Sequence, residues 1–386
     1  MERHRNWPAE CWQFDFEVPM SLSDRYDPVI SIAGSVALDA NGQQRAPGDL
    51  MAQTDMVARE VRLTVEGAGA GADAIAKLVV FYVGEGEDTR EEMLDRLRAG
   101  LPGMEDAVIT AVPVTNLAFP GMMIEVEGYA FADGEYALVR QAPADGVLAV
   151  ANMAFVGGHA AEATGDDDLE SQAASALIAL RNGLVGAGLN LADVVRLNVY
   201  YVSGGGPADL DTVGWVLSQG FSAPGPVVSF VPLPALSRPG CLVMIDAIAM
   251  VGPREVLESP PWQWSESWPF SQALACGDAI FVGGQVAFDA DRKVLEEGDM
   301  AAQTSLIMDR IVAMLEHFGA GVNETMKVGC WYSAGASVDM LKRNALVRSS
   351  YFTKPGPTST GVPTDALIDG GALVQIDVVA MTPRGR

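Results

Sequence analysis

Residues 77–83 read Lys-Leu-Val-Val-Phe-Tyr-Val, and two later stretches repeat this pattern of apolar residues behind a basic one. They are Arg-Leu-Asn-Val-Tyr-Tyr-Val at residues 196–202 and Lys-Val-Gly-Cys-Trp-Tyr at residues 327–332. In each copy a glutamine stands 24 residues before the basic residue and an acidic residue stands 50 residues after it. The anchors are Gln53, Lys77 and Glu127; Gln172, Arg196 and Asp246; and Gln303, Lys327 and Asp377. A repeat of about 120 residues is long enough for its own core, so the chain is one domain repeated three times.

Each copy predicts the order strand, strand, helix, strand, helix, strand. In the third copy, residues 279–286 have the pattern of a strand, and Asp299 precedes a helix whose apolar face includes Ile307 and Ile311. A mixed sheet with helices on one face must bury its other face. We therefore expect an α+β fold in which three domains pack as an intramolecular pseudo-trimer, with sheets inside and helices outside.

Turn-rich stretches divide the copies, one at residues 131–134 and a longer one at residues 252–266. The expected domains are residues 1–134, 135–255 and 256–386, and the first is the most divergent.

The composition limits the classes of partner. Of the 386 residues, 49% are hydrophobic and 19% charged, which predicts a globular protein with a sizeable core. The net charge is −25, and we find no basic cluster. Because proteins bind nucleic acids by neutralising phosphates, we expect neither DNA nor RNA as a partner.

Neither a metal site nor a cofactor is expected. The four cysteines have no C-x-x-C spacing, and the three histidines are dispersed along the chain. No apolar run is long enough to span a bilayer, and the first eight residues lack an apolar signal core, so we expect a cytoplasmic protein.

The third copy carries motifs that resemble the RidA/YjgF family of imine and enamine deaminases. These are Pro-Phe-Ser-Gln-Ala at residues 269–273, Phe-Val-Gly-Gly-Gln at 281–285, Pro-Thr-Ser-Thr-Gly-Val at 357–362 and Val-Gln-Ile-Asp at 374–377. The resemblance is clearest over residues 256–386, fair over 138–251 and weak over 15–134. It implies a chorismate-mutase-like α+β fold and ligand clefts between the subunits of a trimer. Here one chain supplies all three subunits, as a monomer or a dimer of chains.

Family members hold a substrate carboxylate with an arginine 17 residues before the second acid of the closing strand. Counting back from the three acids gives Thr110, Ser229 and Thr360, and a small gap in the third copy gives Ser359 or Thr358 instead. Every register therefore replaces the arginine by a hydroxyl, which lacks its charge. We expect a ligand that is neutral, or whose anion is held elsewhere.

The family also has a water-holding glutamate, the first acid of the closing strand. Its positions here are Glu125, Met244 and Gln375, so only the first copy keeps a carboxylate able to act as a general base. The resemblance places Phe270 near a ligand as well. His159 follows the double glycine of the second copy and is expected near a cleft. The predicted site is therefore catalytic Glu125 with eight candidate substrate-binding residues: Thr110, Ser229, Thr358, Ser359, Thr360, Gln375, Phe270 and His159.

Some recurring residues have simpler interpretations. Lys77, Arg196 and Lys327 begin strands, where a base usually extends to solvent. The tyrosines that recur at one register, such as Tyr82 and Tyr201, are expected in the core.

Three functions remain open. The leading hypothesis is a small-molecule hydrolase that cleaves or hydrates a C–N bond of an imine, enamine or related compound at an interdomain cleft. A second is a ring-opening hydrolase similar to the cyanuric acid and barbiturate enzymes. Those use a Ser-Lys pair in each repeat, and this chain has only five lysines. The third is a non-catalytic protein that binds a small molecule or acts as a scaffold.

Overall fold

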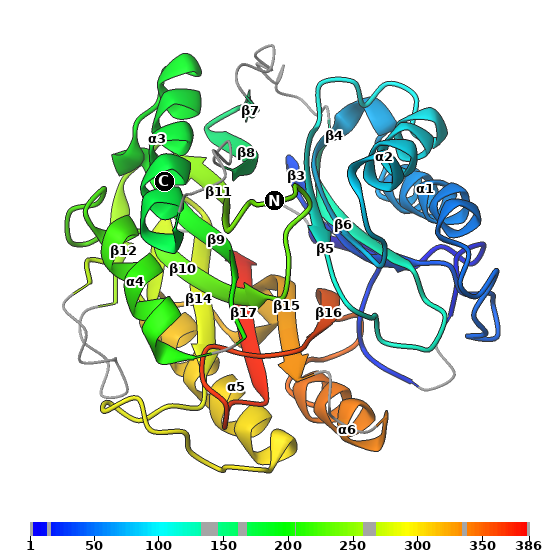
Figure 1. The fold of residues 1–386 in the computed structure, drawn as a ribbon. Coiled ribbons are helices and arrows are strands. Elements are labelled where there is room, and N and C mark those ends of the chain that lie inside the picture. Colours follow the sequence, from blue (N-terminus) through cyan, green and yellow to red (C-terminus); the bar gives the residue numbers. More distant parts are fainter. Residues whose placement is uncertain are drawn as a thin grey trace.

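Residues 3–13, 17–132, 146–160, 168–204, 206–257, 268–333 and 338–383 are described by the structure, a computed structural model. They form three β-sheets, one for each copy of the repeat (Figure 1). We call these copies the first, second and third repeat. The predicted α+β order of strand, strand, helix, strand, helix, strand is confirmed in each.

The elements of the three repeats correspond closely. The first repeat contains β1 (Arg3–Asn6), β2 (Ser23–Tyr26), β3 (Val29–Val36), α1 (Leu50–Gly67), β4 (Ile75–Tyr82), α2 (Glu87–Gly100), β5 (Val108–Pro113) and β6 (Ile124–Phe131). The second contains β7 (Val147–Val150), β8 (Met153–Ala160), α3 (Leu169–Gly186), β9 (Val194–Val202), α4 (Pro207–Ser218), β10 (Val227–Leu233) and β11 (Val243–Met250). The third contains β12 (Arg254–Val256), β13 (Ala273–Cys276), β14 (Ala279–Val286), α5 (Met300–His317), β15 (Thr325–Ser333), α6 (Val338–Ser349), β16 (Thr358–Thr364) and β17 (Val374–Met381).

The closing strand of each repeat lies in the middle of its sheet. The strand orders are β1-β2-β3-β6-β4-β5, β10-β9-β11-β8-β7 and β12-β13-β14-β17-β15-β16. At one end of each sheet, β5, β10 or β16 pairs in parallel with the basic strand β4, β9 or β15. A parallel pair needs a crossover connection, and α2, α4 and α6 supply it.

The recurring glutamine joins a helix to the start of the closing strand. Gln53 on α1 accepts a hydrogen bond from the backbone N–H of Met123 (2.8 Å) and donates one to the carbonyl of Gly121 (2.7 Å). The same two bonds join Gln172 to Leu242 and Gly240, and Gln303 to Leu373 and Gly371. This shared contact explains why the glutamine recurs at one spacing.

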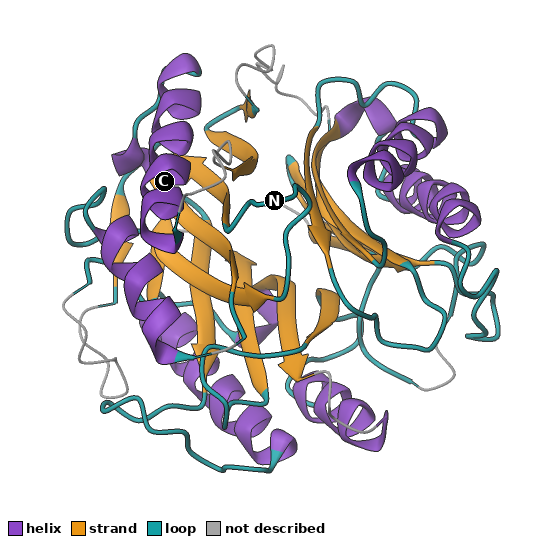
Figure 2. Cartoon of the chain, viewed as in Figure 1, coloured by secondary structure: helices purple, strands orange, loops and turns teal. Residues whose placement is uncertain are grey.

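The helices lie on the outer side of the sheets, and the sheets face one another (Figure 2). One apolar cluster has members from all three repeats, among them Tyr129, Phe155 and Phe281. The rings of Tyr129 and Phe155 stack with their centroids 5.4 Å apart. Neighbouring repeats meet where β3 contacts β16, β5 contacts β8 and β10 contacts β14. These contacts follow a cyclic order, which is compatible with the predicted pseudo-trimer.

Six charged side chains form three ion pairs between repeats, and we call them the central ion-pair cluster. The pairs are Lys77 with Asp246 (2.5 Å), Arg196 with Asp377 (2.6 Å), and Lys327 with Glu127 (3.1 Å). Each base therefore binds the acid of a different repeat, so the cluster links the first repeat to the second, the second to the third, and the third to the first.

The prediction that the three bases extend to solvent is wrong. The exposed fractions of Lys77, Arg196 and Lys327 are 2%, 8% and 4%. The ammonium groups of both lysines also donate to backbone carbonyls of a neighbouring repeat, at 2.8 Å and 2.7 Å. The spacing within one repeat did not reveal this burial because each partner acid belongs to another repeat.

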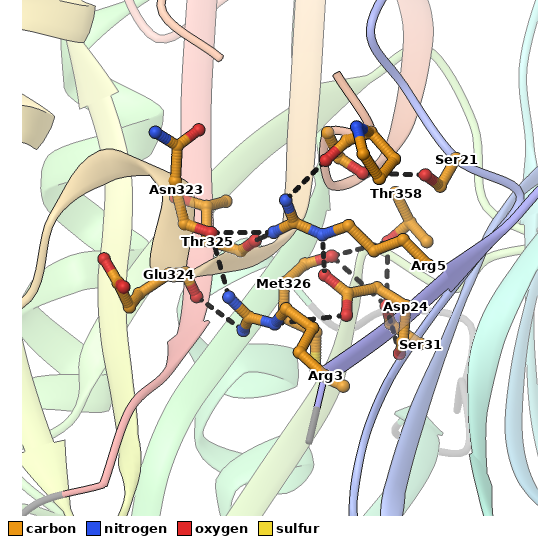
Figure 3. A network of polar contacts seen from close by, with 12 residues as sticks. Arg3, Arg5, Ser21, Asp24, Ser31, Asn323, Glu324, Thr325, Met326 and Thr358 are labelled. Atoms are coloured by element: carbon orange, nitrogen blue, oxygen red, sulfur yellow. Dashed lines mark hydrogen bonds and ion pairs between the residues drawn. The ribbon is translucent and has the colours of Figure 1, made fainter. Parts of the chain in front are cut away.

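The N-terminal strand β1 fastens the first repeat to the third (Figure 3). Arg5 donates to Asp24 (2.8 Å) and to the carbonyl of Thr325 (2.6 Å). Arg3 donates to the carbonyls of Asn323 (2.9 Å) and Glu324 (2.8 Å). These charge-assisted bonds hold the segment that leads to Trp7 and Trp12.

The described residues contain neither a candidate membrane-spanning helix nor a candidate metal site. None of their helices combines the length and apolar character that a membrane crossing requires. Their His, Cys, Asp and Glu side chains form no group of three or more that could hold a metal ion.

Candidate functional site

A cavity of about 150 Å³, which we call the first cleft, lies between the first and third repeats. It forms where β3 and β6 meet β16 and α6. Its polar members include Glu125, Arg348, Asn344 and Ser359. Most of its remaining wall is apolar and includes Trp7, Trp12, Val18, Met20, Leu22, Ala33, Val36, Leu38, Ala118, Phe119, Met122 and Ala345.

Glu125 lies on β6, opposite Val36 of β3. Its carboxyl group covers the backbone of Gly34, where an added Cβ would overlap Oε1. The backbone N–H of Gly361, on β16 of the third repeat, donates a hydrogen bond to the same group. The carboxyl of Glu125 is therefore held by two repeats, and it requires a glycine beneath it.

Burial raises the pKa of Glu125 to about 8, and the nearby negative charge of Glu127 also raises it. The Gly361 N–H and the cations of Lys327 and Arg348 act in the opposite direction. At neutral pH most Glu125 carboxyls are therefore protonated. Such a group can donate a proton first and serve as a base afterwards.

Arg348 on α6 is a second ionisable side chain in the first cleft, and it is only 7% exposed. Among the described residues, its Nε and Nη1 have no hydrogen-bond partner. The guanidinium does contact the thiol of Cys330. A Cβ added to Gly361 would lie 4.0 Å from Nη2 of Arg348, so this arginine and Glu125 both adjoin Gly361.

Two tryptophans that follow β1 cover part of the first cleft. Nε1 of Trp7 donates to the carbonyl of Trp12 at 2.7 Å, and the two rings meet edge to face at 5.1 Å. A hollow of about 500 Å³ adjoins the cavity and shares Trp7, Val18, Met20 and Ser21 with it. The enclosed part therefore lies beneath the tryptophans.

The second cleft lies between the third and second repeats and has a volume of about 50 Å³. Gln375 takes the place of Glu125 there, and its amide covers Gly284. Phe230 lies at the position of Gly361, and its ring centroid is 5.8 Å from that of Trp268 and 6.1 Å from that of Phe270. Aromatic rings thus fill the space that is open in the first cleft.

The third cleft lies between the second and first repeats and is a more open hollow of about 280 Å³. His159 and Ile109 line it. Met244 takes the place of Glu125, and its sulfur would be 2.6 Å from a Cβ added to Gly158. Neither an acid nor a base stands at the position of Glu125 in this cleft.

Comparisons with known proteins agree with this repeated architecture. The family model described as Endoribonuclease L-PSP matches residues 20–132, 140–251 and 264–382. The chain belongs to this family. The match confirms the resemblance to RidA/YjgF proteins and its occurrence in three tandem copies.

The relatives of known sequence match a single repeat. A RutC family protein of Pyrococcus abyssi is 34% identical over 110 residues, which are 27% of this chain and 84% of that protein. A RutC family protein of Pyrococcus horikoshii is 30% identical over 112 residues, 29% of this chain and 86% of that protein. Among solved structures, a chorismatase covers 80% of this chain and 93% of its own, with a TM-score of 0.54 and 12% identity, which shows a shared fold.

The predicted site residues of this RidA/YjgF protein are divided among the three clefts and the interior. Glu125 and Ser359 line the first cleft, Gln375 and Phe270 the second, and His159 the third. The other four hydroxyl residues do not line any of them. Thr110 donates to Asp246 at 2.5 Å, Thr358 bonds Ser31 and the carbonyl of Met326 at 2.9 Å, and Thr360 faces the central ion-pair cluster.

Strand alternation explains where these hydroxyls lie. Val228 and Phe230 line the second cleft, so Ser229 between them points to the opposite face of β10. Thr110 and Thr360 hold the corresponding strand positions and lie beside the central ion-pair cluster. The positions that face the clefts are Ile109, Val228 and Ser359, and only the third of these is a hydroxyl.

Arg348 was not predicted from the sequence, because it lies on α6 and the resemblance places the family's arginine on the strand before the closing strand. Leu217 on α4 precedes it by 131 residues, the same separation as between Arg196 and Lys327. A leucine buried in the core of the second repeat is therefore matched by an arginine in the third. This replacement of a leucine by an arginine at matching helix positions is the feature of the sequence that could have indicated Arg348.

Proposed function

We propose that this RidA/YjgF protein is a small-molecule hydrolase acting on a C–N bond of an imine, enamine or related compound, with Glu125 as its acid and base. The observation that carries the proposal is the carboxyl of Glu125, buried in the apolar first cleft with a pKa of about 8. Enzymes tune carboxyl groups to this range for proton transfer near neutral pH.

The proposed hydrolysis of an imine uses the Glu125 carboxyl group in both its protonated and its ionised form. Protonated Glu125 gives its proton to the imine nitrogen, which makes the adjacent carbon electrophilic. The resulting carboxylate takes a proton from water as the water oxygen bonds to that carbon. The same proton then goes to the nitrogen of the carbinolamine. The C–N bond breaks while the Glu125 carboxylate takes the proton of the carbinolamine hydroxyl, so ammonia or an amine leaves, a carbonyl compound remains and Glu125 is protonated again. No electron transfer or cofactor is required.

The ring-opening alternative is less well supported. Lys77 and Lys327 are bound to Asp246 and Glu127 in the central ion-pair cluster, so neither is available as the base of a Ser-Lys pair. RNA is also disfavoured as a substrate, despite the family's description, because the net charge of −25 repels a polyanion. A non-catalytic binding protein remains the rival hypothesis.

An assay of turnover tests the proposal. The panel contains imines generated in situ, hydrazones and cyclic ureas, and it includes chorismate because the fold neighbour is a chorismatase. We expect release of ammonia or an amine from one class, strongly reduced in Glu125→Gln and retained in Gln375→Ala. Tight binding without turnover of any panel compound would support the binding protein instead.

A further inference from the structure

We propose that Arg348 makes the first cleft a binding site for a small carboxylate whose apolar body is about the size of one six-membered ring. This inference rests on the first cleft being the functional site, but it concerns binding and not turnover. It names a residue on helix α6, where the strand position expected to hold a substrate anion carries Ser359 instead.

The guanidinium of Arg348 is buried without the partners that a structural arginine has. Among the described residues its Nε and Nη1 have no hydrogen-bond partner, although only 7% of the residue is exposed. Arg196 is buried to a similar degree, yet it forms an ion pair with Asp377 at 2.6 Å. Burying an unpaired cation is costly, so the two open donors of Arg348 imply a partner that arrives with a ligand.

The groups around Arg348 do not supply a compensating anion. Burial raises the pKa of the Cys330 thiol that it contacts, so this sulfur remains neutral. The pKa of Tyr332 is also raised by burial, and Glu125 is mostly protonated at neutral pH. The charge of Arg348 therefore favours an anion in this cleft.

Packing provides no reason for an arginine at this position. The helices α4 and α6 both contain 12 residues, and Leu217 on α4 occupies the position that Arg348 has on α6. Leu217 is fully buried in the second repeat. A leucine is thus compatible with the fold here, and the charge of Arg348 serves something other than core packing.

The size of the cavity limits the rest of the ligand. Its volume of about 150 Å³ matches that of an apolar cavity known to admit benzene. Trp7, Trp12 and Phe119 contribute aromatic wall to it. Both Arg348 and Glu125 adjoin Gly361, whose missing side chain leaves the space between them open. A carboxylate at Arg348 would therefore leave another atom of the same ligand near Glu125.

Calorimetric titration with benzoate and benzamide tests this site, because the two probes share a ring and differ in charge. We expect the wild type to bind benzoate about 10- to 100-fold more tightly than benzamide, the range for charge-assisted hydrogen bonds. Arg348→Leu should remove this preference and keep benzamide binding, since leucine is the residue of the second repeat. Arg343→Leu, on the exposed side of the same helix, is the matched control and should keep the preference.

Two results would overturn the site: equal affinities of the wild type for benzoate and benzamide, or a preference that survives in Arg348→Leu. Retained benzamide binding shows that the variant is folded, and Arg348→Lys should recover part of the preference because it restores charge without the planar fork. Glu125→Gln separates this inference from the proposed hydrolysis. It should abolish turnover and leave the preference for benzoate intact.

Discussion

The first and second clefts are built on corresponding strands and helices, yet the first is an open, mostly apolar cavity and the second is largely filled by aromatic rings. Gly361 and Val18 of the first cleft correspond to Phe230 and Trp268 of the second. At these two positions, therefore, only the second cleft has aromatic side chains. Two of the ionisable residues, Glu125 and Arg348, follow the same division. Their pairs are Glu125 with Gln375, and Arg348 with Leu217.

When three repeats are joined in one chain, each cleft can change its residues independently of the other two. In a homotrimer each substitution enters every cleft, whereas here Phe230 fills the second cleft and leaves Gly361 in the first. The two features that the proposed chemistry requires, a carboxyl group with a raised pKa and an open space beside it, occur together in the first cleft. The aromatic filling of the second stabilises the contact between repeats instead.

The largest effect is expected from Glu125→Gln, which gives the first cleft the amide that Gln375 supplies in the second. The amide cannot donate a proton to the substrate or accept one from water, so we expect turnover to fall about 100- to 10,000-fold. Gln375→Ala and Met244→Ala should keep the wild-type rate within about twofold, because neither residue can carry a proton to substrate. Steady-state rates on the compound that the wild type turns over provide the measurement.

A full rate in Glu125→Gln together with a loss in Gln375→Ala or Met244→Ala would assign the chemistry to another cleft. Thermal unfolding of each variant serves as the control for folding. The rate comparison is made only between variants that unfold cooperatively near the wild-type temperature.

The central ion-pair cluster is common to all repeats, and breaking it should damage both clefts. Lys77→Met leaves Asp246 buried with hydrogen bonds from Thr110 and Asn198 but without its cation. Removing one partner of a buried pair costs about 3–5 kcal/mol, which we expect in denaturant unfolding. Arg62→Met is the control, because its ion pair with Glu66 lies on the exposed side of α1 and contributes about 0.5 kcal/mol or less.

A loss below about 1 kcal/mol in Lys77→Met would mean that the cluster does not hold the repeats together.

The sequence revealed the features that lie within one repeat. Constant spacing of Gln53, Lys77 and Glu127 and of their counterparts predicted three α+β repeats, and hydrophobic periodicity predicted their helices. The absence of an acid at Met244 and Gln375 also pointed to unequal clefts. Each of these inferences compares one repeat with another along the chain.

Features formed between repeats were not predictable in the same way. Lys77 binds Asp246 of the second repeat, and Arg348 of the third repeat adjoins the cleft of Glu125 in the first. No spacing within a repeat encodes such contacts. Thr110 illustrates a second limit, since neighbouring residues of a strand point to opposite faces and the spacing alone does not tell which face meets a cleft; its hydroxyl bonds Asp246 in the interior.

The filled second cleft can be opened with the residues of the first. Trp268→Val reproduces Val18 and removes an indole that packs directly on Gly214 of α4. We expect a loss of about 1–3 kcal/mol in the free energy of unfolding, less than for a fully buried tryptophan because Trp268 is partly buried. Urea titration of the purified variant measures it.

Gly214→Ala sharpens this test, because Ala345 is the corresponding residue of the first cleft. In the wild type the added methyl overlaps the Trp268 ring and should cost about 1–3 kcal/mol. In the Trp268→Val background the methyl has space, so its cost should largely disappear. Strict additivity of the two changes would contradict the proposed contact between these positions.

The smallest expected effect concerns the pH dependence of stability. Glu125 has a folded pKa of about 8 against an ordinary value of 4.5, so between these values the folded protein keeps a proton that the unfolded chain has lost. Stability therefore falls as the pH rises through this window, by up to about 1.4 kcal/mol per pH unit for this one group. Glu127, Lys327, Arg348 and Tyr332 face the same carboxyl and remain in the variant.

Glu125→Gln isolates this contribution, because an amide does not titrate. The variant should gain stability relative to the wild type as the pH rises from 6 to 7, by about 1 kcal/mol in the difference between their free energies of unfolding. Gln375→Met changes the matching position of the second cleft without adding or removing a titratable group, so its difference from the wild type should be the same at both pH values. A difference for Glu125→Gln that is independent of pH would mean that Glu125 is already ionised at pH 6. In that case the first cleft would hold a carboxylate beside Arg348, and Glu125 would begin the reaction as a base.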